Sequence, residues 1–513
     1  MSNHAAAMYR KMVLMFTKGI HIRDVLSSMG ITSIYLYGIG EMGRVVINDL
    51  AESEMILSAY DKSVIGEKHI TINDRVTLSI FGSECIPDDS IPILVSQAAN
   101  TVDIMKDLAD KGIDRKRLVS LNLILEMGYS YVLKERTTKF SLYDKHFLIV
   151  GANFDNKGAQ AMTFVVVDTL RKEYPTCNIW FCPNFQDDIY ERDDYSFFIL
   201  SECYRNGSLL YEAAFLFDAI IDVSGYAVAS MKNFGSTDRM VTSMKLGYDL
   251  GIPYYIMPQS FGPMDFPGYR LAELGELLSK SKVIFARELT GYNLLKEKLG
   301  LSNVYKSNDM VLQYGQIDAS RIYEKHARKL DRFNANGGVV IVPNGNLLLY
   351  EEESRVIEFY QWMIRHLLSI NEKVYIIPHS YDNVMCDKIY DGFTSDERVK
   401  YINEEMDCID FEHCIRDSKF LVASRYHAVV HAYKEGVPCI IIGWAEKYKE
   451  LSELFAQEKY LFDVREGLDK NAISEAIKQM SEENEYEAEK IANLNKSIVK
   501  IDLFETLWRD IDN

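Results

Sequence analysis

Short apolar runs alternate with longer amphipathic stretches along most of this chain. An apolar run of about four to eight residues between turn signals is typical of a buried strand, and the amphipathic stretches have the period of a helix. Strands that alternate with helices predict parallel sheets with helices on their faces, so the fold class is α/β. The runs that we interpret as strands are 34–37, 56–60, 93–95, 118–121, 147–150, 178–181, 219–223, 254–257, 283–286, 303–306, 339–342, 374–377, 399–402, 420–423 and 439–442.

Two polar segments, 134–141 and 318–336, interrupt this alternation and look like linkers. At roughly 150 residues per domain, a chain of 513 residues also indicates about three domains. The predicted domains are a Rossmann-like N-terminal module at 1–140, a second α/β domain at 141–330, and a third at 331–513 that ends in charged helices.

The charge and the apolar runs restrict the function. The chain has 57 Lys and Arg against 75 Asp and Glu, a formal net charge of −18. This argues against a nucleic-acid partner, which requires a basic surface to neutralise phosphates. No run reaches the roughly 18–20 apolar residues of a membrane-spanning helix, and the N-terminal residues lack a secretory signal pattern. The eight cysteines are scattered and form no CxxC pair, which is typical of a protein whose thiols stay reduced. We therefore expect a cytoplasmic protein.

A glycine-rich turn lies in the N-terminal module. Gly38, Gly40 and Gly43 form a GxGxxG pattern between a predicted strand and a predicted helix, and Asp61 ends the next strand. In a dinucleotide site such glycines approach the phosphates and the acid binds the ribose hydroxyls, so these four residues are candidate nucleotide ligands. The alternative is a purely structural turn, since residues 1–140 contain no catalytic constellation.

Cationic side chains stand where several predicted strands end. Arg287 and His379 follow two strands, and Arg425 and His427 lie between a third strand and the start of a helix. The carboxyl ends of strands in two facing α/β units can converge on one cleft. Arginine offers a fixed fork for carboxylate or phosphate, and histidine can give up a proton near neutral pH. These residues therefore predict an anion-binding cleft with His427 as an acid.

Two neighbouring features have competing interpretations. Asn156 and Lys157 lie in a loop before a predicted helix, where a helix N-terminus and a lysine would suit an anion, although every βα unit needs such a loop. His431 follows His427 by four residues, the spacing of two zinc ligands on one helix face. Since no third ligand is evident, we expect no metal and interpret His431 as a packed helix residue.

Eight short segments share a recognisable order and spacing, namely 156–162, 222–226, 257–263, 286–288, 307–309, 377–379, 424–427 and 443–448. Through these segments the residues from about 146 to 460 resemble the polysaccharide pyruvyl transferases. The chain departs from the family's pattern at Ala445 and Glu446, and in the Asn-Lys-Gly-Ala form of its first loop. The N-terminal 140 residues lie outside this resemblance and are similar to small Rossmann-like modules of bacterial sugar-modifying proteins.

The resemblance implies a GT-B-like pair of Rossmann-like domains with the site between them. It implies transfer of a pyruvyl group from phosphoenolpyruvate to a pair of sugar hydroxyls, forming a pyruvate ketal in bacterial surface-polysaccharide biosynthesis, with no cofactor required beyond the donor. It also implies that His427 is the catalytic acid. The residues that would bind substrate are Arg287, Arg425, His379, Asn156, Lys157, Gln259 and Lys447.

Two other functions stay open at this point. A GT-B glycosyltransferase that uses a nucleotide sugar would need a slot for a base and a ribose, whereas phosphoenolpyruvate needs two cationic residues. A non-catalytic nucleotide-sensing protein would have a donor pocket without activity and a nucleotide bound at the GxGxxG turn. The sequence also leaves open the acceptor sugar, the oligomeric state, and whether a lipid-linked acceptor brings the protein to the inner face of the membrane.

Overall fold

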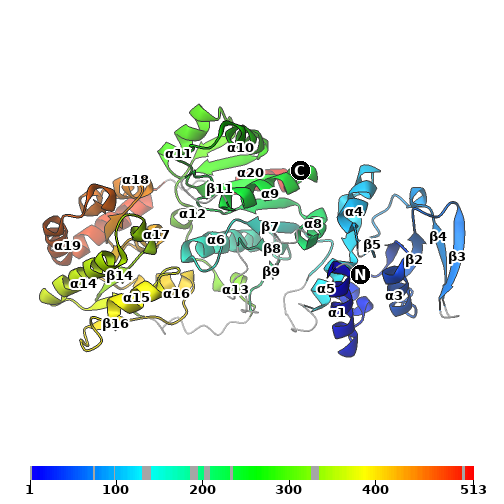
Figure 1. Ribbon diagram of the computed structural model, residues 1–513, viewed down its shortest axis with the longest axis horizontal. Coiled ribbons are helices and arrows are strands. Elements are labelled where there is room, and N and C mark those ends of the chain that lie inside the picture. Colours follow the sequence, from blue (N-terminus) through cyan, green and yellow to red (C-terminus); the bar gives the residue numbers. More distant parts are fainter. Residues whose placement is uncertain are drawn as a thin grey trace.

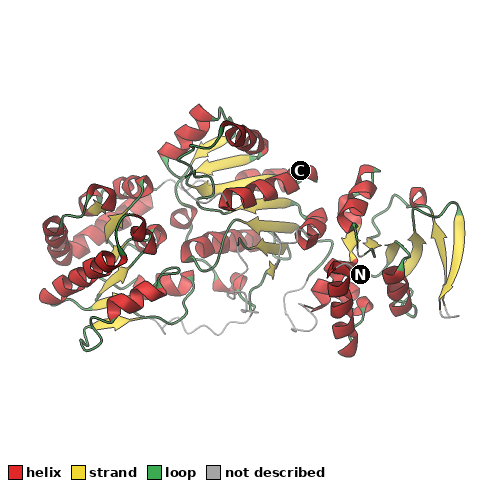
Figure 2. Cartoon of the chain, in the orientation of Figure 1, coloured by secondary structure: helices red, strands yellow, loops and turns green. Residues whose placement is uncertain are grey.

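The computed structural model describes residues 3–72, 76–97, 99–129, 140–184, 194–200, 208–230, 235–324, 334–498 and 503–512. These residues form three successive α/β units that lie in a row, each with its own sheet (Figures 1 and 2). Every predicted strand is confirmed, within about two residues at its ends. The predicted α/β fold class is therefore correct. The predicted boundary at 330/331 and most of the linker at 134–141 lie outside the described residues.

The first unit has six strands in the order β3-β4-β2-β1-β5-β6. Neighbours pair parallel except for β3 and β4, which pair antiparallel at one edge. The apolar pattern does not predict this hairpin because exposed residues such as Lys68 and His69 interrupt it. The elements are α1 (Asn3–Thr17), α2 (Ile22–Ser28), β1 (Ile34–Tyr37), α3 (Glu41–Asp49), β2 (Ile56–Tyr60), β3 (Glu67–Ile72), β4 (Val76–Phe81), β5 (Ile93–Val95), α4 (Thr101–Asp110), β6 (Leu118–Ser120) and α5 (Leu121–Met127).

The second unit has seven strands in the order β13-β12-β11-β10-β7-β8-β9, all paired parallel. Its central strands are buried along their whole length, as parallel strands covered on both faces are. Its elements are β7 (His146–Val150), α6 (Lys157–Glu173), β8 (Asn178–Cys182), β9 (Phe198–Ile199), α8 (Ser208–Ala213), β10 (Ala219–Asp222), α9 (Gly235–Asp249), β11 (Tyr254–Gln259), α10 (Gly268–Lys280), β12 (Val283–Ala286), α11 (Leu289–Asn293), β13 (Val304–Lys306), α12 (Met310–Gln313) and α13 (Ala319–Ile322).

The third unit has six parallel strands in the order β16-β15-β14-β17-β18-β19. The chain then returns to the second unit, where the ring of Trp508 in the last helix lies 5.5 Å from the ring of Tyr174 at the end of α6. The elements are β14 (Val339–Val342), α14 (Glu353–Ser369), β15 (Val374–Ile376), α15 (Asn383–Tyr390), β16 (Val399–Tyr401), α16 (Cys408–Ile415), β17 (Phe420–Ala423), α17 (Tyr426–Lys434), β18 (Cys439–Gly443), α18 (Glu446–Leu454), β19 (Leu461–Asp463), α19 (Lys470–Ser497) and α20 (Glu505–Asp512).

The first unit shares a continuous hydrophobic core with the second. Polar contacts cross the same boundary: the buried carboxylate of Glu212 in α8 accepts hydrogen bonds from Ser120 Oγ at 2.7 Å and Asn122 Nδ2 at 3.1 Å. Arg115 donates to the carbonyl oxygens of Phe215 and Phe217. The module is therefore docked on the body through buried surface. Among the described residues, no helix is both long and apolar enough to cross a membrane.

Candidate active site

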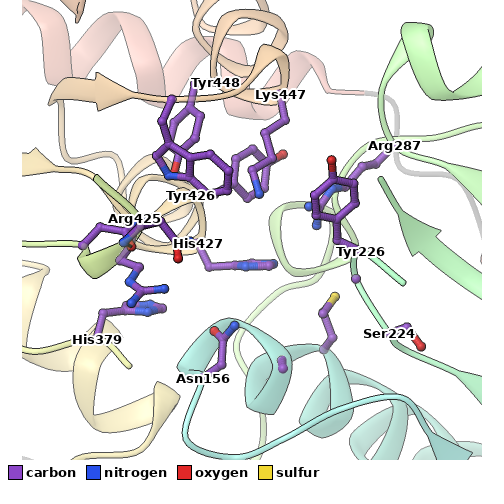
Figure 3. Close-up of a pocket in the computed structure, with 16 residues that line it drawn as sticks. Asn156, Ser224, Tyr226, Arg287, His379, Arg425, Tyr426, His427, Lys447 and Tyr448 are labelled. Carbon is purple, nitrogen blue, oxygen red and sulfur yellow. Dashed lines mark hydrogen bonds between the residues drawn. The ribbon is translucent and has the colours of Figure 1, made fainter. Parts of the chain in front are cut away.

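A cavity of about 140 Å³ lies between the second and third units, at the carboxyl ends of their strands (Figure 3). In the close-up, Asn156, Ser224, Tyr226 and Arg287 approach it from the second unit, opposite the labelled side chains of the third. The lining residues are Asn156, Ala159, Met162, Ser224, Gly225, Tyr226, Arg287, Asn344, Asn346, His379, Arg425, Tyr426, His427, Trp444, Lys447 and Tyr448.

Arg287 follows β12 and is held rigidly in place. Its Nε donates to Ser260 Oγ at 3.0 Å and to Glu288 Oε1 at 2.8 Å, and its Nη1 donates to Asp309 Oδ2 at 2.9 Å. The guanidinium also stacks on the ring of Tyr426, 4.5 Å from its centroid. Nη2 makes no hydrogen bond with any described residue. The carboxylates thus fix the fork and leave one nitrogen for a ligand.

Arg425 is the N-cap residue of α17 and has a similar arrangement in the third unit. Its Nε and Nη2 donate to the two oxygens of Asp382, at 2.7 and 2.5 Å. Asp382 is buried and also accepts a hydrogen bond from the backbone N–H of Gly345 at 2.9 Å. Within the described ranges, Nη1 of Arg425 has no hydrogen-bond partner. Each predicted arginine therefore presents one nitrogen that its carboxylate partner does not use.

His427 lies in the first turn of α17, with its Nε2 3.4 Å from Oδ2 of Asp309. Burial lowers the pKa of His427 to about 4, although Asp309 opposes this shift. Burial alone would raise the pKa of Asp309, but His427 and Arg287 outweigh it and hold that pKa well below its usual range. In the absence of a bound anion His427 is therefore neutral at pH 7. The sequence, which gives no measure of burial, suggested a pKa near neutrality.

His379 follows β15 and lines the cavity from the third unit. It is 1% exposed, and neither ring nitrogen has a hydrogen-bond partner among the described residues. Burial holds its pKa well below the usual value, and the neighbouring cations lower it further. A buried imidazole with two unused nitrogens at a cavity wall is suited to bind a polar ligand.

His431 faces away from the cavity into the third unit. Its Nδ1 lies 2.7 Å from Glu412 Oε1, and the same carboxylate accepts hydrogen bonds from Lys434. This supports the interpretation of His431 as a packed helix residue. Across the described residues, no group of three or more His, Cys, Asp or Glu side chains is placed to hold a metal ion.

Lys447, in the first turn of α18, lies among aromatic rings. Its Nζ is 5.1 Å from the ring centroids of Tyr426 and Trp444, and 5.2 Å from that of Tyr226. These rings attract the cation through their π faces and hold it at the cavity wall. Lys447 is thus a third positive charge on the lining, beside Arg287 and Arg425.

Two predicted binding residues do not line the cavity. Lys157 begins α6, but its Nζ points to the carbonyl oxygens of Pro378 at 3.3 Å and His379 at 3.5 Å. Gln259, at the end of β11, is fully buried and its Oε1 accepts a hydrogen bond from the backbone N–H of Ala227. Lys157 therefore joins the two units, and Gln259 supports the loop at 224–228. Asn156, by contrast, lines the cavity and caps α6 through Gly158 N–H at 3.0 Å.

Sequence reasoning did not select Asp309, Asp382 or Glu288, although all three hold the predicted arginines. Asp309 and Glu288 lie within segments that matched the family, and Asp382 precedes α15. Acidic residues that follow strand ends were a usable signal. Their partners could not be identified without the fold, because Asp382 and Arg425 are 43 residues apart in the chain.

The GxGxxG turn of the first unit lies apart from this cavity. Gly38 has a φ of +91°, and a Cβ on it would lie 2.7 Å from Gln97 Nε2. A Cβ on Gly43 would lie 2.2 Å from the carbonyl oxygen of Gly38, and Gly40 is the N-cap of α3. Asp61 accepts hydrogen bonds from the backbone N–H groups of Ile39 and Ser63. Each residue of the motif thus has a local structural role, which accounts for it without a ligand.

The fold and the cavity define a GT-B-like protein, in which two Rossmann-like units face each other across a cation-rich site. The chain belongs to the polysaccharide pyruvyl transferase family, because the model of that family matches residues 156–446, more than half of the chain. The family predicted from the sequence is confirmed, and with it an enzyme of the pyruvyl transferase type.

Comparison with solved structures finds several that are similar to this chain at low sequence identity. The S. aureus MnaA–UDP structure has a TM-score of 0.47 and 12% identity, covering 71% of this chain and 94% of its own. UDP-GlcNAc 2-epimerase from Neisseria meningitidis bound to UDP-GlcNAc has a TM-score of 0.45 and 16% identity, covering 71% and 100%. Medicago truncatula UGT71G1 with UDP-glucose has a TM-score of 0.43 and 12% identity, covering 72% and 99%. No curated protein matches the chain in sequence.

Proposed function

We propose that this protein transfers the pyruvyl group of phosphoenolpyruvate to two hydroxyls of a sugar, forming a pyruvate ketal in bacterial surface-polysaccharide biosynthesis. The charge of the cavity supports this most directly. Three cations line it, namely Arg287, Arg425 and Lys447, and no Asp or Glu among the described residues does, although the chain carries a net charge of −18. Phosphoenolpyruvate carries a phosphate and a carboxylate, the anions that arginine forks bind best.

The size of the cavity also favours a small donor. Pockets for drug-sized ligands commonly enclose about 300–1,000 Å³, whereas this one encloses about 140 Å³. A nucleotide sugar does not fit this space alone, because its base and ribose would have to occupy the neighbouring space beyond Tyr226, Trp444 and Lys447. A three-carbon phosphate with no further cofactor is therefore the better match to the space between Arg287 and Arg425.

The reaction gives His427 a definite task. An enol ether becomes reactive at C2 once C3 is protonated, so a positioned acid is required, and such an acid typically contributes about 10²- to 10⁴-fold. Although His427 is neutral without a ligand, a nearby anion favours the charged form of imidazole and raises its pKa. Binding of the donor would thus protonate the group that must deliver the proton.

Mass spectrometry tests this function directly. The protein is incubated with phosphoenolpyruvate and a panel of methyl hexosides and lipid-linked sugars, and one of them should gain the mass of pyruvate minus water while phosphate is released. The His427→Gln variant should bind phosphoenolpyruvate but give little product. Transfer of a hexose from UDP-glucose or UDP-GlcNAc with phosphoenolpyruvate left intact would contradict the proposal, as would failure of calorimetry to detect phosphoenolpyruvate binding.

A further inference from the structure

A second cavity of about 380 Å³ adjoins the first between the same two units. The two cavities share Tyr226, Trp444 and Lys447 in their walls. The second is bounded by the loop that follows β11, the start of α11, the start of α18 and Tyr350. A molecule bound there would therefore lie next to a donor held by Arg287 and Arg425.

The neighbours Arg287 and Glu288 face different cavities. Arg287 lines the smaller one and Glu288 the larger one. Oε1 of Glu288 accepts hydrogen bonds from Arg287 Nε and Ser260 Oγ, both at 2.8 Å. Oε2 has no hydrogen-bond partner in the described parts of the chain, and the residue is 6% exposed. Such an oxygen on a fixed, largely buried carboxylate is placed to accept a proton from a ligand in the second cavity.

The character of the second cavity suits a sugar. Tyr226, Tyr350 and Trp444 supply aromatic faces, against which the apolar face of a pyranose ring can pack. Its charged residues have both signs, with the acids Asp265, Glu288, Glu446 and Glu450 against the cations Lys298, Lys447 and Arg465. Carboxylates accept hydrogen bonds from hydroxyls and repel a phosphate, so the two cavities discriminate between a neutral polyol and the anionic donor.

A contact between the units holds this cavity together. Glu450 in α18 accepts hydrogen bonds from the backbone N–H of Leu289 at 2.6 Å and from that of Thr290 at 3.2 Å. It also accepts one from Thr290 Oγ1 at 3.0 Å. The first turn of α11 in the second unit is thereby tied to α18 in the third. Any ligand that fills the cavity would therefore contact both units, in the same cleft that holds the proposed donor site.

We propose that the second cavity binds the acceptor, a glycoside with two neighbouring hydroxyls, and that Glu288 accepts the proton of the hydroxyl that attacks first. This inference rests on the proposed pyruvyl transfer and adds the acceptor site and its base. Glu288 is then a catalytic residue, because its Oε2 contacts the reacting hydroxyl.

The proposed steps balance in atoms and charge. His427 gives a proton to C3, the first hydroxyl oxygen bonds to C2, and Glu288 takes the proton of that hydroxyl. The bond between C2 and the phosphate oxygen then breaks, and the second hydroxyl oxygen bonds to C2 and gives its proton to the leaving phosphate. The proton on Glu288 returns to His427 through solvent. Of the two hydroxyl protons, one thus ends in the new methyl group and one on phosphate, without any redox change.

Glu288→Gln tests the proposed base with the full-length chain and the methyl hexoside or lipid-linked sugar that gives product in the mass-spectrometric assay. The amide keeps the shape and an acceptor oxygen for Ser260, but it cannot take the proton. We expect turnover to fall at least about 10²-fold. Phosphoenolpyruvate affinity should change less than about threefold, because the amide oxygen can still accept the hydrogen bond of Arg287 Nε and Asp309 still accepts that of Nη1. The control is Glu297→Gln, an exposed acid of the same unit that lines neither cavity, which should match the wild type.

Tyr350→Ala provides a second, independent test at the rim of the cavity, away from the ion pairs of Arg287. The acceptor KM should rise about tenfold while phosphoenolpyruvate affinity stays unchanged, because Tyr350 lines only the second cavity. Near-native turnover of Glu288→Gln, an unchanged acceptor KM in Tyr350→Ala, or lost donor binding in either variant would overturn the inference. These results differ from failure of the proposed function itself, in which the wild-type protein would form no ketal at all.

Discussion

Gly158 lies directly beneath the ring of His427, and a Cβ on Gly158 would come within 2.1 Å of His427 Cγ. Gly158 belongs to the first turn of α6 in the second unit, and His427 belongs to the first turn of α17 in the third. The backbone of one unit therefore sets the position of the proposed acid of the other. The backbone at Gly158 is not left-handed, so its conformation alone does not require a glycine. The contact with His427 supplies the reason, because any larger residue would clash with the ring.

We expect Gly158→Ala to reduce turnover by about 10²-fold, since a displacement of about 1 Å at a reacting group costs that much. The second unit should keep its fold, because alanine is favoured over glycine within a helix by up to about 1 kcal/mol, and the clash with His427 should instead displace the ring or the start of α17. Steady-state kinetics and thermal unfolding measure the two effects. The matched control is Gly275→Ala in α10, where the new Cβ would meet only Leu299 Cδ2 at 3.7 Å. Wild-type turnover in Gly158→Ala would show that the position of the His427 ring is not critical.

Donor binding should take up a proton. The pKa of His427 is about 4 without a ligand, and a bound anion raises it. At any pH between the pKa of His427 in the free protein and its higher pKa in the complex, the complex holds more protons than the separated partners. Affinity should therefore increase as pH falls from about 8 to 7, a range above the second pKa of a phosphate ester, which is about 6. Calorimetry in buffers of different ionisation enthalpy measures the number of protons taken up. The uptake should approach one in the wild type and disappear in His427→Gln; equal uptake in both proteins would assign the titration to another group.

Replacing either arginine by lysine should weaken donor binding. Arg287 and Arg425 each use two nitrogens on carboxylates and present the remaining one to the cavity. A lysine ammonium cannot hold its carboxylate partners and reach the donor in the same fork geometry. Hydrogen bonds to charged groups contribute about 1.5–3 kcal/mol, so affinity for phosphoenolpyruvate should drop at least about tenfold.

The control for this pair is Arg355→Lys, whose side chain in α14 is 69% exposed and lines neither cavity. Calorimetry with phosphoenolpyruvate gives the dissociation constants of all three variants. If both Arg287→Lys and Arg425→Lys bind the donor as tightly as the wild type, the two residues do not clamp it, whatever their effect on turnover.

The strands were predictable from the sequence because parallel strands buried on both faces are short continuous apolar runs. The location of four cavity residues was predictable for a related reason, since strand ends in α/β folds converge on a cleft. These residues are Arg287, His379, Arg425 and His427. The side-chain orientations of Lys157 and Gln259 could not be predicted in this way. A residue at the start of a helix or the end of a strand can face either the cleft or the neighbouring structure. The pKa of His427 also depends on burial between two units, which no local pattern encodes.

The N-terminal module gives the last prediction. The sequence places no catalytic constellation in residues 1–140, so the module is not needed for the proposed chemistry itself. Its core nevertheless continues into that of the second unit, and the buried Glu212 accepts hydrogen bonds from Ser120 and Asn122. A fragment that begins near Ser141 would expose the apolar surface around α8, so it should aggregate, as size-exclusion chromatography would reveal.

The double variant Ser120→Ala, Asn122→Ala removes two hydrogen bonds from the Glu212 carboxylate without deleting the module. Loss of hydrogen bonds to a buried charged group should lower the free energy of unfolding by about 1–3 kcal/mol and thus the Tm, while phosphoenolpyruvate affinity stays unchanged. Thr71→Ala, which removes an exposed hydrogen bond to Thr77 in the same module, should leave the Tm within about one degree of the wild type because exposed bonds contribute little. A soluble, fully active fragment of residues 141–513 would contradict this prediction. It would show that the interface contributes little to the stability of the second and third units and that the module folds independently of them.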